Sequence, residues 1–248
     1  MELVTYLNNP ALKLAFLGEI GKHELADQIT KGTYGQMNGQ WHGCAIGCSL
    51  RSLNLLQGKQ HDLNTSLHAR IPNELGWPLW LAYAEDNIFE NLPDELAKTW
   101  PRRLAEAIPV GVTVSDVVLA KMLRWVLIGD RFGVVHAAAA ESVKNIVTRM
   151  GALFDRTIAG ELVQEAEWNE AARDAWDAWA ARDAWAARAA WAARDARAAR
   201  DAWAARAAWA ARDARAAWDA LAAETRDAFY PAMSDELLRL LRELEPPA

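Results

Sequence analysis

The sequence predicts an all-α protein, a multi-helix bundle, and three observations support this. Apolar residues recur at helical spacing along most of the 248 residues. No segment alternates convincingly between apolar and polar residues; residues 110–114 come nearest to a strand but are too isolated to form a sheet. From Glu161 to Tyr230 the chain has neither Gly nor Pro and is rich in Ala, the strongest helix former.

The helices of the first 160 residues follow from start and stop signals. Residues 3–30 have helical periodicity, and Pro10 and the glycines at 18 and 21 are expected to divide them into short helices. A polar, Gly-rich loop over residues 32–43 precedes a helix over 44–56. Pro78 stands near a first turn, where its missing N–H costs least, and Ser115 is expected to cap a helix. The further predicted helices cover residues 61–70, 75–92, 94–108, 115–129 and 136–158.

The C-terminal part contains an internal repeat. Residues 183–200, DAWAARAAWAARDARAAR, recur at 201–218 with one change, Arg200 to Trp218. Eighteen residues make five helical turns, so the copy returns each side chain to the same angular position. We expect residues 161–230 to break into two or three packed helices; the alternative is a rod that forms homo-oligomers. A last helix is predicted over 234–245, capped by Ser234 and ended by Pro246 and Pro247. The expected domains are residues 1–160 and 161–248.

Composition excludes some classes of function. The net charge of −6 argues against general binding of nucleic acid or of anionic membranes. No run approaches the roughly 20 apolar residues of a membrane span, and we expect a cytoplasmic protein. Cys44 and Cys48 fit a reducing compartment better than a disulfide framework. No cofactor is predicted.

A glycine- and cysteine-bearing motif is the first candidate site. Residues 41–52 read WHGCAIGCSLRS. Glycines permit close backbone approach, free N–H groups at a helix start attract anions, and Arg supplies a planar fork for phosphate or carboxylate. The sequence therefore predicts a site for a small anionic ligand, with aromatic stacking from Tyr34 or Trp41. Its predicted contact residues are Tyr34, Trp41, Gly43, Gly47, Ser49, Arg51, Arg102 and Arg103.

The same motif has two other interpretations. Small residues would let the helix pack tightly, with both thiols buried as small hydrophobes. Alternatively, Cys44 and Cys48, one helical turn apart, could face one metal ion, with His42, His61 or His68 completing the ligands. A CxxxC pair on a helix is a weak metal signal, and no metal site is assigned.

An acidic group is the second candidate site. Glu85, Asp86 and Glu90 fall within one predicted helix, with Asp86 and Glu90 four residues apart on one side. Like charges at this spacing repel unless a cation or an Arg lies between them. A solvated face or a salt bridge to Arg102 or Arg103 is the first interpretation; acid–base catalysis or metal binding is the alternative.

Several segments of the chain together form a recognisable set: GCAIGCSL (residues 43–50), His68, NELGWP (73–78), Leu81, Glu85, Asp86, IFENLP (88–93), Trp100 and Pro101. The set resembles a group of uncharacterised phage and bacterial proteins with a GCAIGC-type motif. The Ala-rich tail is similar to a domain of immunity proteins. Such relatives carry His after the Cys-Ser/Thr-Leu run, where this chain has Arg51, and this weakens a metal site there. The resemblance implies a binding protein in conflict systems, as phage counter-defence or immunity.

The sequence favours a non-enzymatic binding protein that sequesters a small anionic, nucleotide-like signal. One alternative is an immunity-type protein that inhibits a protein toxin or defence effector through a Trp/Arg face, since these residues are enriched at hot spots. The other is a metal- or thiol-dependent enzyme built on Cys44, Cys48, His42 and His68. A homo-oligomer formed through the C-terminal helices is a further expectation.

Overall fold

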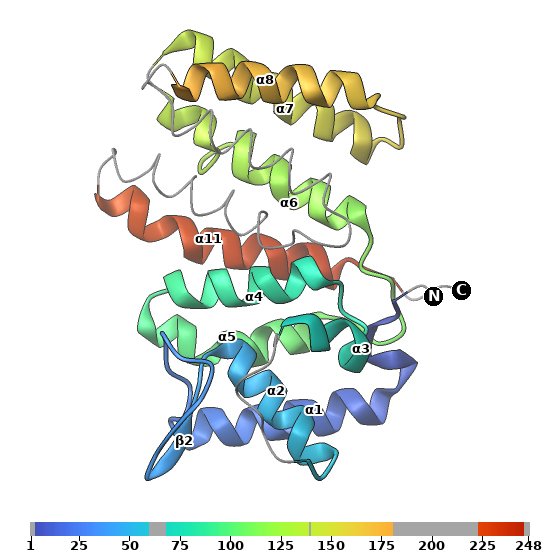
Figure 1. Cartoon of the computed structure of the whole chain (residues 1–248), viewed down its shortest axis with the longest axis vertical. Helices are drawn as coiled ribbons and strands as arrows, with labels where there is room; N and C mark the ends of the chain where they lie inside the picture. The colour runs from blue at the N-terminus through green and yellow to red at the C-terminus, as the bar shows by residue number, and fades with distance from the viewer. Residues whose placement is uncertain (1–2, 60–67, 139, 181–222, 246–248) are drawn as a thin grey trace. The chain divides into compact units, whose positions relative to one another are not determined.

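The computed structural model describes residues 3–59, 68–138, 140–180 and 223–245, and most of these residues lie in helices (Figure 1). A two-stranded antiparallel sheet is the one sheet of this described part. The predicted all-α class is therefore confirmed. Contacts divide the chain into two compact units: unit 1 comprises Met1–Val114 and Ser234–Ala248, and unit 2 comprises Ser115–Met233.

Unit 1 is built around helix α2, which contacts α1, α4 and α5. α1 also packs on α5, and α5 on α4, so these four helices share one apolar core. Trp77 and Trp100 are among the largest fully buried side chains. The elements of unit 1 are η1 (Thr5–Asn8), α1 (Pro10–Leu25), β1 (Gln36–Asn38), β2 (Gln40–His42), α2 (Ala45–Leu56), η2 (His68–Arg70), α3 (Ile71–Leu75), α4 (Leu79–Asn91) and α5 (Asp94–Ala107).

Helix α1 is continuous, so the prediction that Gly18 and Gly21 divide this region is wrong. Its start is well defined: the Asn9 side chain accepts hydrogen bonds from the N–H groups of Ala11 and Leu12, and Pro10 follows at the first helical position. Each interior Gly costs about 1 kcal/mol relative to Ala. Burial of apolar side chains such as Phe16 and Ile20 outweighs that cost, at about 1.5–3 kcal/mol each.

The predicted loop over residues 32–43 contains a β-hairpin. Met37 pairs with Trp41 across it, and Gly39 occupies the turn with φ of +77°. Each strand is three residues long, too short to show a period of two in the sequence. The hairpin leads the chain from α1 into α2.

The predicted helix over residues 75–92 starts later than expected, at Leu79. Gly76 ends α3 in the left-handed conformation with φ of +67°, which favours glycine. A Cβ atom there would lie 1.9 Å from the Val4 carbonyl oxygen. Trp77 then enters the core, where its ring makes edge contacts with Tyr6 and Phe16. Close approach of distant segments therefore fixes this boundary.

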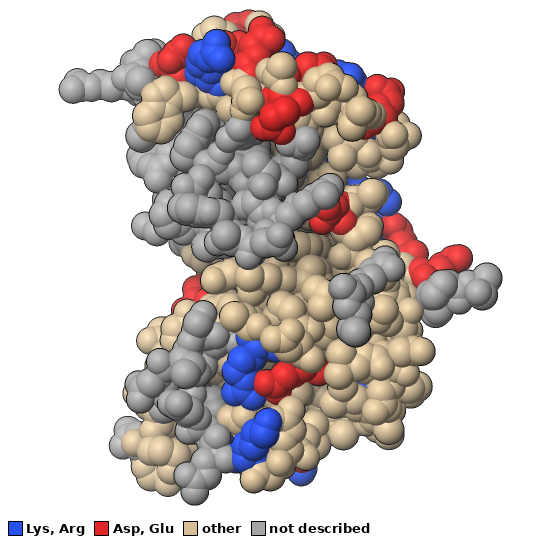
Figure 2. Space-filling view, turned by 45° about the vertical axis from the view of Figure 1, so that its right-hand side comes forward, with Lys and Arg blue, Asp and Glu red and all other residues tan. Residues whose placement is uncertain are grey.

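In unit 2, α7 packs against both α6 and α8. The predicted helix over 136–158 is instead a 3₁₀ turn followed by α7, and α7 continues through Gly151, which lies against Ile128 of α6. Acidic and basic side chains are intermixed over α7 and α8 (Figure 2) and include an ion pair between Arg156 and Glu167. The helices of unit 2 are α6 (Asp116–Ile128), η3 (Val134–Ala137), α7 (Glu141–Ile158) and α8 (Glu165–Ala180).

Helix α11 (Ala223–Arg242) begins in unit 2 and ends in unit 1. The predicted start at Ser234 is wrong, because this residue is buried inside the helix. Pro231 also lies within α11, and an interior Pro costs about 3 kcal/mol or more. Phe229 before it and Leu237 after it are fully buried, at about 1.5–3 kcal/mol each, which offsets this cost.

Some predictions fall outside the described residues. These include His61, the repeat at 183–218 and the two terminal prolines. The domain boundary at residue 160 stays a prediction, because much of the expected second domain is not described. Among the helices that are described, none combines the length and apolarity needed to cross a lipid bilayer.

Candidate metal centre

The start of α2 places the two cysteines in different surroundings. Cys44 is the N-cap residue; its Sγ accepts a hydrogen bond from the Gly47 N–H at 3.5 Å, and its own N–H donates to the Thr33 carbonyl at 2.7 Å. The Cys48 thiol donates instead to the Gly43 carbonyl at 3.5 Å. The two thiols therefore have separate hydrogen-bond partners, and the possible metal ligands described next lie near Cys44.

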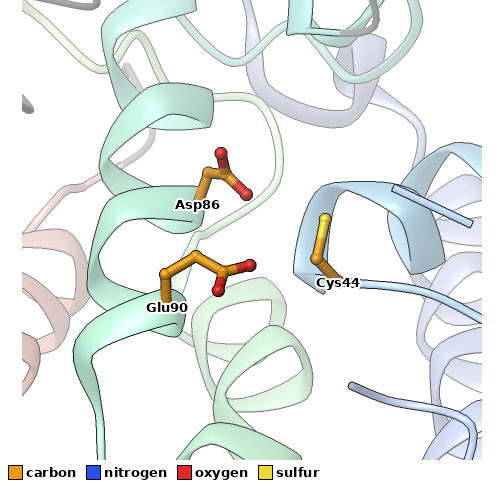
Figure 3. Close-up of side chains that lie close together, drawn as sticks. All are labelled: Cys44, Asp86 and Glu90. Atoms are coloured by element: carbon orange, nitrogen blue, oxygen red, sulfur yellow. The ribbon is translucent and has the colours of Figure 1, made fainter. Parts of the chain in front are cut away.

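Two carboxylates of α4 lie opposite Cys44. Asp86 and Glu90 extend from one side of this helix toward the start of α2 (Figure 3). Three possible ligand atoms lie within 4.8 Å of one another: the Cys44 Sγ, one carboxylate oxygen of Asp86 and one of Glu90. Cys44 is only 2 % exposed, and the Asp86 side chain is 21 % exposed. The packing of α2 on α4 thus joins the two candidate sites of the sequence.

The surroundings of these three groups are acidic. Burial raises the pKa of the Cys44 thiol, and the negative charge of Asp86 raises it further. Burial also raises the pKa of Glu90, against the lowering effect of its hydrogen bond from the Gly32 N–H. Among the described residues, no Lys or Arg forms an ion pair with Asp86 or Glu90. The charge of Lys31 lowers the pKa of Glu90, but its ammonium pairs with Asp94 and not with the cluster.

His68 borders the same cluster. Its Nε2 lies 3.4 Å from the Asp86 Oδ2 and makes no hydrogen bond within the described residues. The imidazole stacks on Tyr83, with 4.2 Å between ring centroids and 10° between planes, and the Tyr34 ring meets it edge-on at 5.8 Å. The His68 side chain is 8 % exposed. The two aromatic rings thus fix the imidazole beside a ligand-type carboxylate.

Glu85 does not join this cluster, although the sequence placed it with Asp86 and Glu90. Its side chain is fully buried, and the Ser49 hydroxyl donates to its Oε1 at 3.1 Å. Burial raises the pKa of Glu85 to about 8. Adjacent residues of a helix point about 100° apart, so Asp86 reaches the Cys44 side while Glu85 enters the core.

The residues predicted to bind an anion are engaged in contacts within the protein. The Ser49 hydroxyl is engaged with Glu85. A Cβ atom at Gly47 would lie 1.9 Å from the Tyr34 carbonyl oxygen, and one at Gly43 would lie 2.9 Å from the same atom. These two glycines therefore allow the main chain at Tyr34 to lie close to the start of α2, so the close approach expected for a ligand is made by the protein's own backbone.

The arginines of the predicted anion site have neighbours within unit 1. The Arg51 guanidinium lies over the buried Trp41 ring at 4.9 Å. On α5, Arg102 pairs with Glu106 and Arg103 with Asp235, each at 2.8 Å. Neither α5 arginine forms the salt bridge to the α4 carboxylates that the sequence suggested.

The chain was compared with known protein families, curated proteins and solved structures. No protein-family model, curated protein or solved structure matches this chain. The resemblance to phage and bacterial proteins stays a prediction, and any assignment of function depends on the geometry of the site.

Proposed function

We propose that the protein binds a divalent metal cation in unit 1, through the Cys44 thiolate and the carboxylates of Asp86 and Glu90. The observation that carries this proposal is the convergence of their three ligand atoms within 4.8 Å. Thiolates and carboxylates are both metal ligands, and three protein ligands leave a position for water or an external ligand. Because Cys44 is almost fully buried, the site suits an ion better than a bulky molecule.

Electrostatics supports a cation at this position. Two ionised carboxylates whose oxygens lie within 4.8 Å of each other repel by at least about 3 kcal/mol at an effective dielectric constant of about 20. An exposed pair on a helix surface would cost only about 0.2–0.5 kcal/mol. The charge of Lys31 lowers the pKa of Glu90, but its ammonium pairs with Asp94, and no described Lys or Arg forms an ion pair with Asp86 or Glu90. A divalent ion between the two carboxylates would turn the repulsion into attraction.

The cation also connects this site to the anionic ligand expected from the sequence. An acidic cluster repels a nucleotide-like anion, whereas a bound divalent ion with an open coordination position attracts one. We therefore propose sequestration of a small anionic ligand as a metal-dependent, non-enzymatic function. The alternative of a protein toxin or effector partner relied on the Trp/Arg face of the tail, and much of that tail lies outside the described residues.

The first test is metal binding by the full chain. Metal-free protein is titrated with Zn²⁺ in a calorimeter, and bound metal is counted by elemental analysis after gel filtration. We expect one ion per chain. Cys44→Ser, Asp86→Asn and Glu90→Gln should each weaken binding by more than about 100-fold, since even the loss of an outer-shell partner costs about 10–100-fold.

Two matched variants act as controls. Cys48→Ser changes the neighbouring thiol, and Asp94→Asn changes an exposed carboxylate that pairs with Lys31. Both should bind Zn²⁺ as the unchanged protein does. Failure of the unchanged protein to retain metal, or equal losses in the controls and in the ligand variants, would overturn the proposal.

A further inference from the structure

The residue types around Asp86 indicate which metal ions the site of the proposed function would prefer, and this inference rests on that function. We infer that His68 is the fourth protein ligand of this site, completing a Cys–His–Asp–Glu set that takes Zn²⁺ or a similar transition-metal ion in preference to Mg²⁺ or Ca²⁺. The external anion of the proposed function then enters as a fifth ligand, because four-coordinate zinc sites can expand to five-coordinate. The juxtaposition that carries this inference is the His68 Nε2 beside the Asp86 Oδ2, at the edge of the cluster with Cys44 and Glu90.

The distance between His68 and Asp86 fits two ligands of one ion. Zinc bonds to nitrogen and oxygen of about 2.0–2.1 Å at a tetrahedral angle place two ligand atoms roughly 3.3 Å apart. The observed separation of Nε2 and Oδ2 is 3.4 Å. This pair therefore already has the spacing of adjacent zinc ligands.

The imidazole is also held ready to bind. Stacking on Tyr83 and the edge of Tyr34 fix the ring plane, and the side chain is more than nine-tenths buried. Buried polar atoms are hydrogen-bonded in the great majority of cases, yet the Nε2 of His68 makes no hydrogen bond to any residue that the structure describes. An imidazole nitrogen that faces a carboxylate oxygen without a hydrogen bond is satisfied when both atoms bind the same cation.

The other ligands need only a small adjustment. Sulfur and oxygen ligands of a tetrahedral zinc lie roughly 3.6 Å apart. The ligand atoms of Cys44, Asp86 and Glu90 lie within 4.8 Å of one another, so a sulfur–oxygen pair must close by about 1.2 Å at most and the oxygen–oxygen pair by about 1.5 Å at most. Rotation of the Glu90 side chain supplies movement of this size without moving α4, because two of its torsions lie beyond Cβ. The His68 nitrogen is not among the atoms that share this 4.8 Å limit, so its ring must also move toward the other ligands.

The ligand types decide the preference for the ion. A thiolate and an imidazole are the ligands of Zn²⁺ and similar transition metals, whereas Mg²⁺ and Ca²⁺ prefer sites made of oxygen atoms alone. Without His68 the set would hold two oxygens and one sulfur, and selection against the oxygen-binding ions would depend on Cys44 alone. His68 therefore contributes selectivity as well as affinity.

The test uses the full chain loaded with Zn²⁺ or Co²⁺. X-ray absorption of the zinc-loaded unchanged protein should show one sulfur neighbour, together with the multiple-scattering signature of one imidazole. The cobalt-loaded protein should show a thiolate charge-transfer band and the intense visible bands of four-coordinate Co²⁺. A large excess of Mg²⁺ or Ca²⁺ should not displace either metal.

The variant His68→Phe keeps a ring against Tyr83 and removes the nitrogen. It should weaken Zn²⁺ binding by more than about 100-fold and reduce the visible cobalt bands while leaving the thiolate band. The control His136→Ala changes a histidine of unit 2 that contacts the Gly129 carbonyl, and it should have no effect.

The outcomes separate this inference from the proposed function. If the unchanged protein binds no metal, the proposed function fails and the inference fails with it. If metal binds with a sulfur neighbour but without an imidazole, the proposed function stands and the inference is overturned. A loss of about 10–100-fold in His68→Phe, with unchanged cobalt bands, would also overturn it, because His68 would then only orient Asp86 through a hydrogen bond.

Discussion

Replacing Gly47 by Ala should destabilise unit 1 strongly, although Ala is the better helix former. Gly47 lies in the first turn of α2, where an added Cβ atom would be 1.9 Å from the Tyr34 carbonyl oxygen. The oxygen would have to retreat by at least about 1 Å to reach a tolerable contact. The Thr33 carbonyl, one residue before Tyr34, accepts a hydrogen bond from the Cys44 N–H, so movement of this segment would strain that hydrogen bond as well.

The expected cost follows from two opposing effects. Overpacking of a close-packed site costs about 1–3 kcal/mol, and because the atom that must move belongs to the main chain, we expect the upper end, about 3 kcal/mol. The gain in helix propensity from Gly to Ala is about 1 kcal/mol at most. Gly18→Ala is the matched control, since Gly18 is exposed within α1 and no atom of the described residues lies within 4 Å of its added Cβ. It should stabilise the protein by about 0.5–1 kcal/mol.

The assay is urea unfolding followed by far-ultraviolet circular dichroism, with hydrogen exchange of the α2 amides to report on unit 1 specifically. Gly47→Ala should unfold at a lower urea concentration than the unchanged protein, and its α2 amides should exchange faster. Equal midpoints for the unchanged protein and Gly47→Ala would refute the argument. So would a loss of stability in Gly18→Ala as large as that in Gly47→Ala.

Three further predictions concern unit 1. His23 is buried, and burial lowers its pKa from 6.5, so below about pH 6.5 the unfolded chain binds a proton that the folded chain does not. The free energy of unfolding should therefore fall as the pH drops from about 6.5 through the lowered pKa of His23. His23→Gln should flatten this dependence on pH in urea titrations. Tyr6→Phe removes a buried hydrogen bond to the Ala105 carbonyl and should lower the free energy of unfolding by about 1–3 kcal/mol; an unchanged midpoint would show that this bond is replaced. Arg103→Ala removes a partly exposed ion pair with Asp235 and should cost less than about 1 kcal/mol, with Zn²⁺ binding unaffected; a larger loss in either measurement would contradict the placement of this arginine.

Local signals predicted several helices well. Asp94 and Ser115 stand beside or at the start of observed helices, and the helix after Cys44 begins within one residue of the prediction. The errors at Gly18 and Ser234 have one cause. Both residues are local signals for a helix boundary, and in both cases buried side chains on either side stabilise a helix that continues through the signal.

The candidate site was visible in the sequence only as separate parts. Cys44 was singled out for its spacing from Cys48, and Asp86 and Glu90 for their spacing of four on one helix. The spacing of each pair describes one helix alone, so it does not show that the two helices pack with these faces together. His68 was one of three histidines considered as ligands, and only its position beside Asp86 distinguishes it from His42, since His61 is not described.

The sequence by itself determined that this protein is helical, because helix periodicity, caps and Ala content act over one or two turns of the chain. It also determined which residue types are present for chemistry at each position. Only the tertiary structure decided which of them meet. Packing of α2 on α4 brings a thiol to two carboxylates, and contacts of Tyr83 and Tyr34 orient His68. These contacts between distant segments depend on how whole helix faces bury their apolar surface. A local sequence pattern does not specify which helix faces pack together.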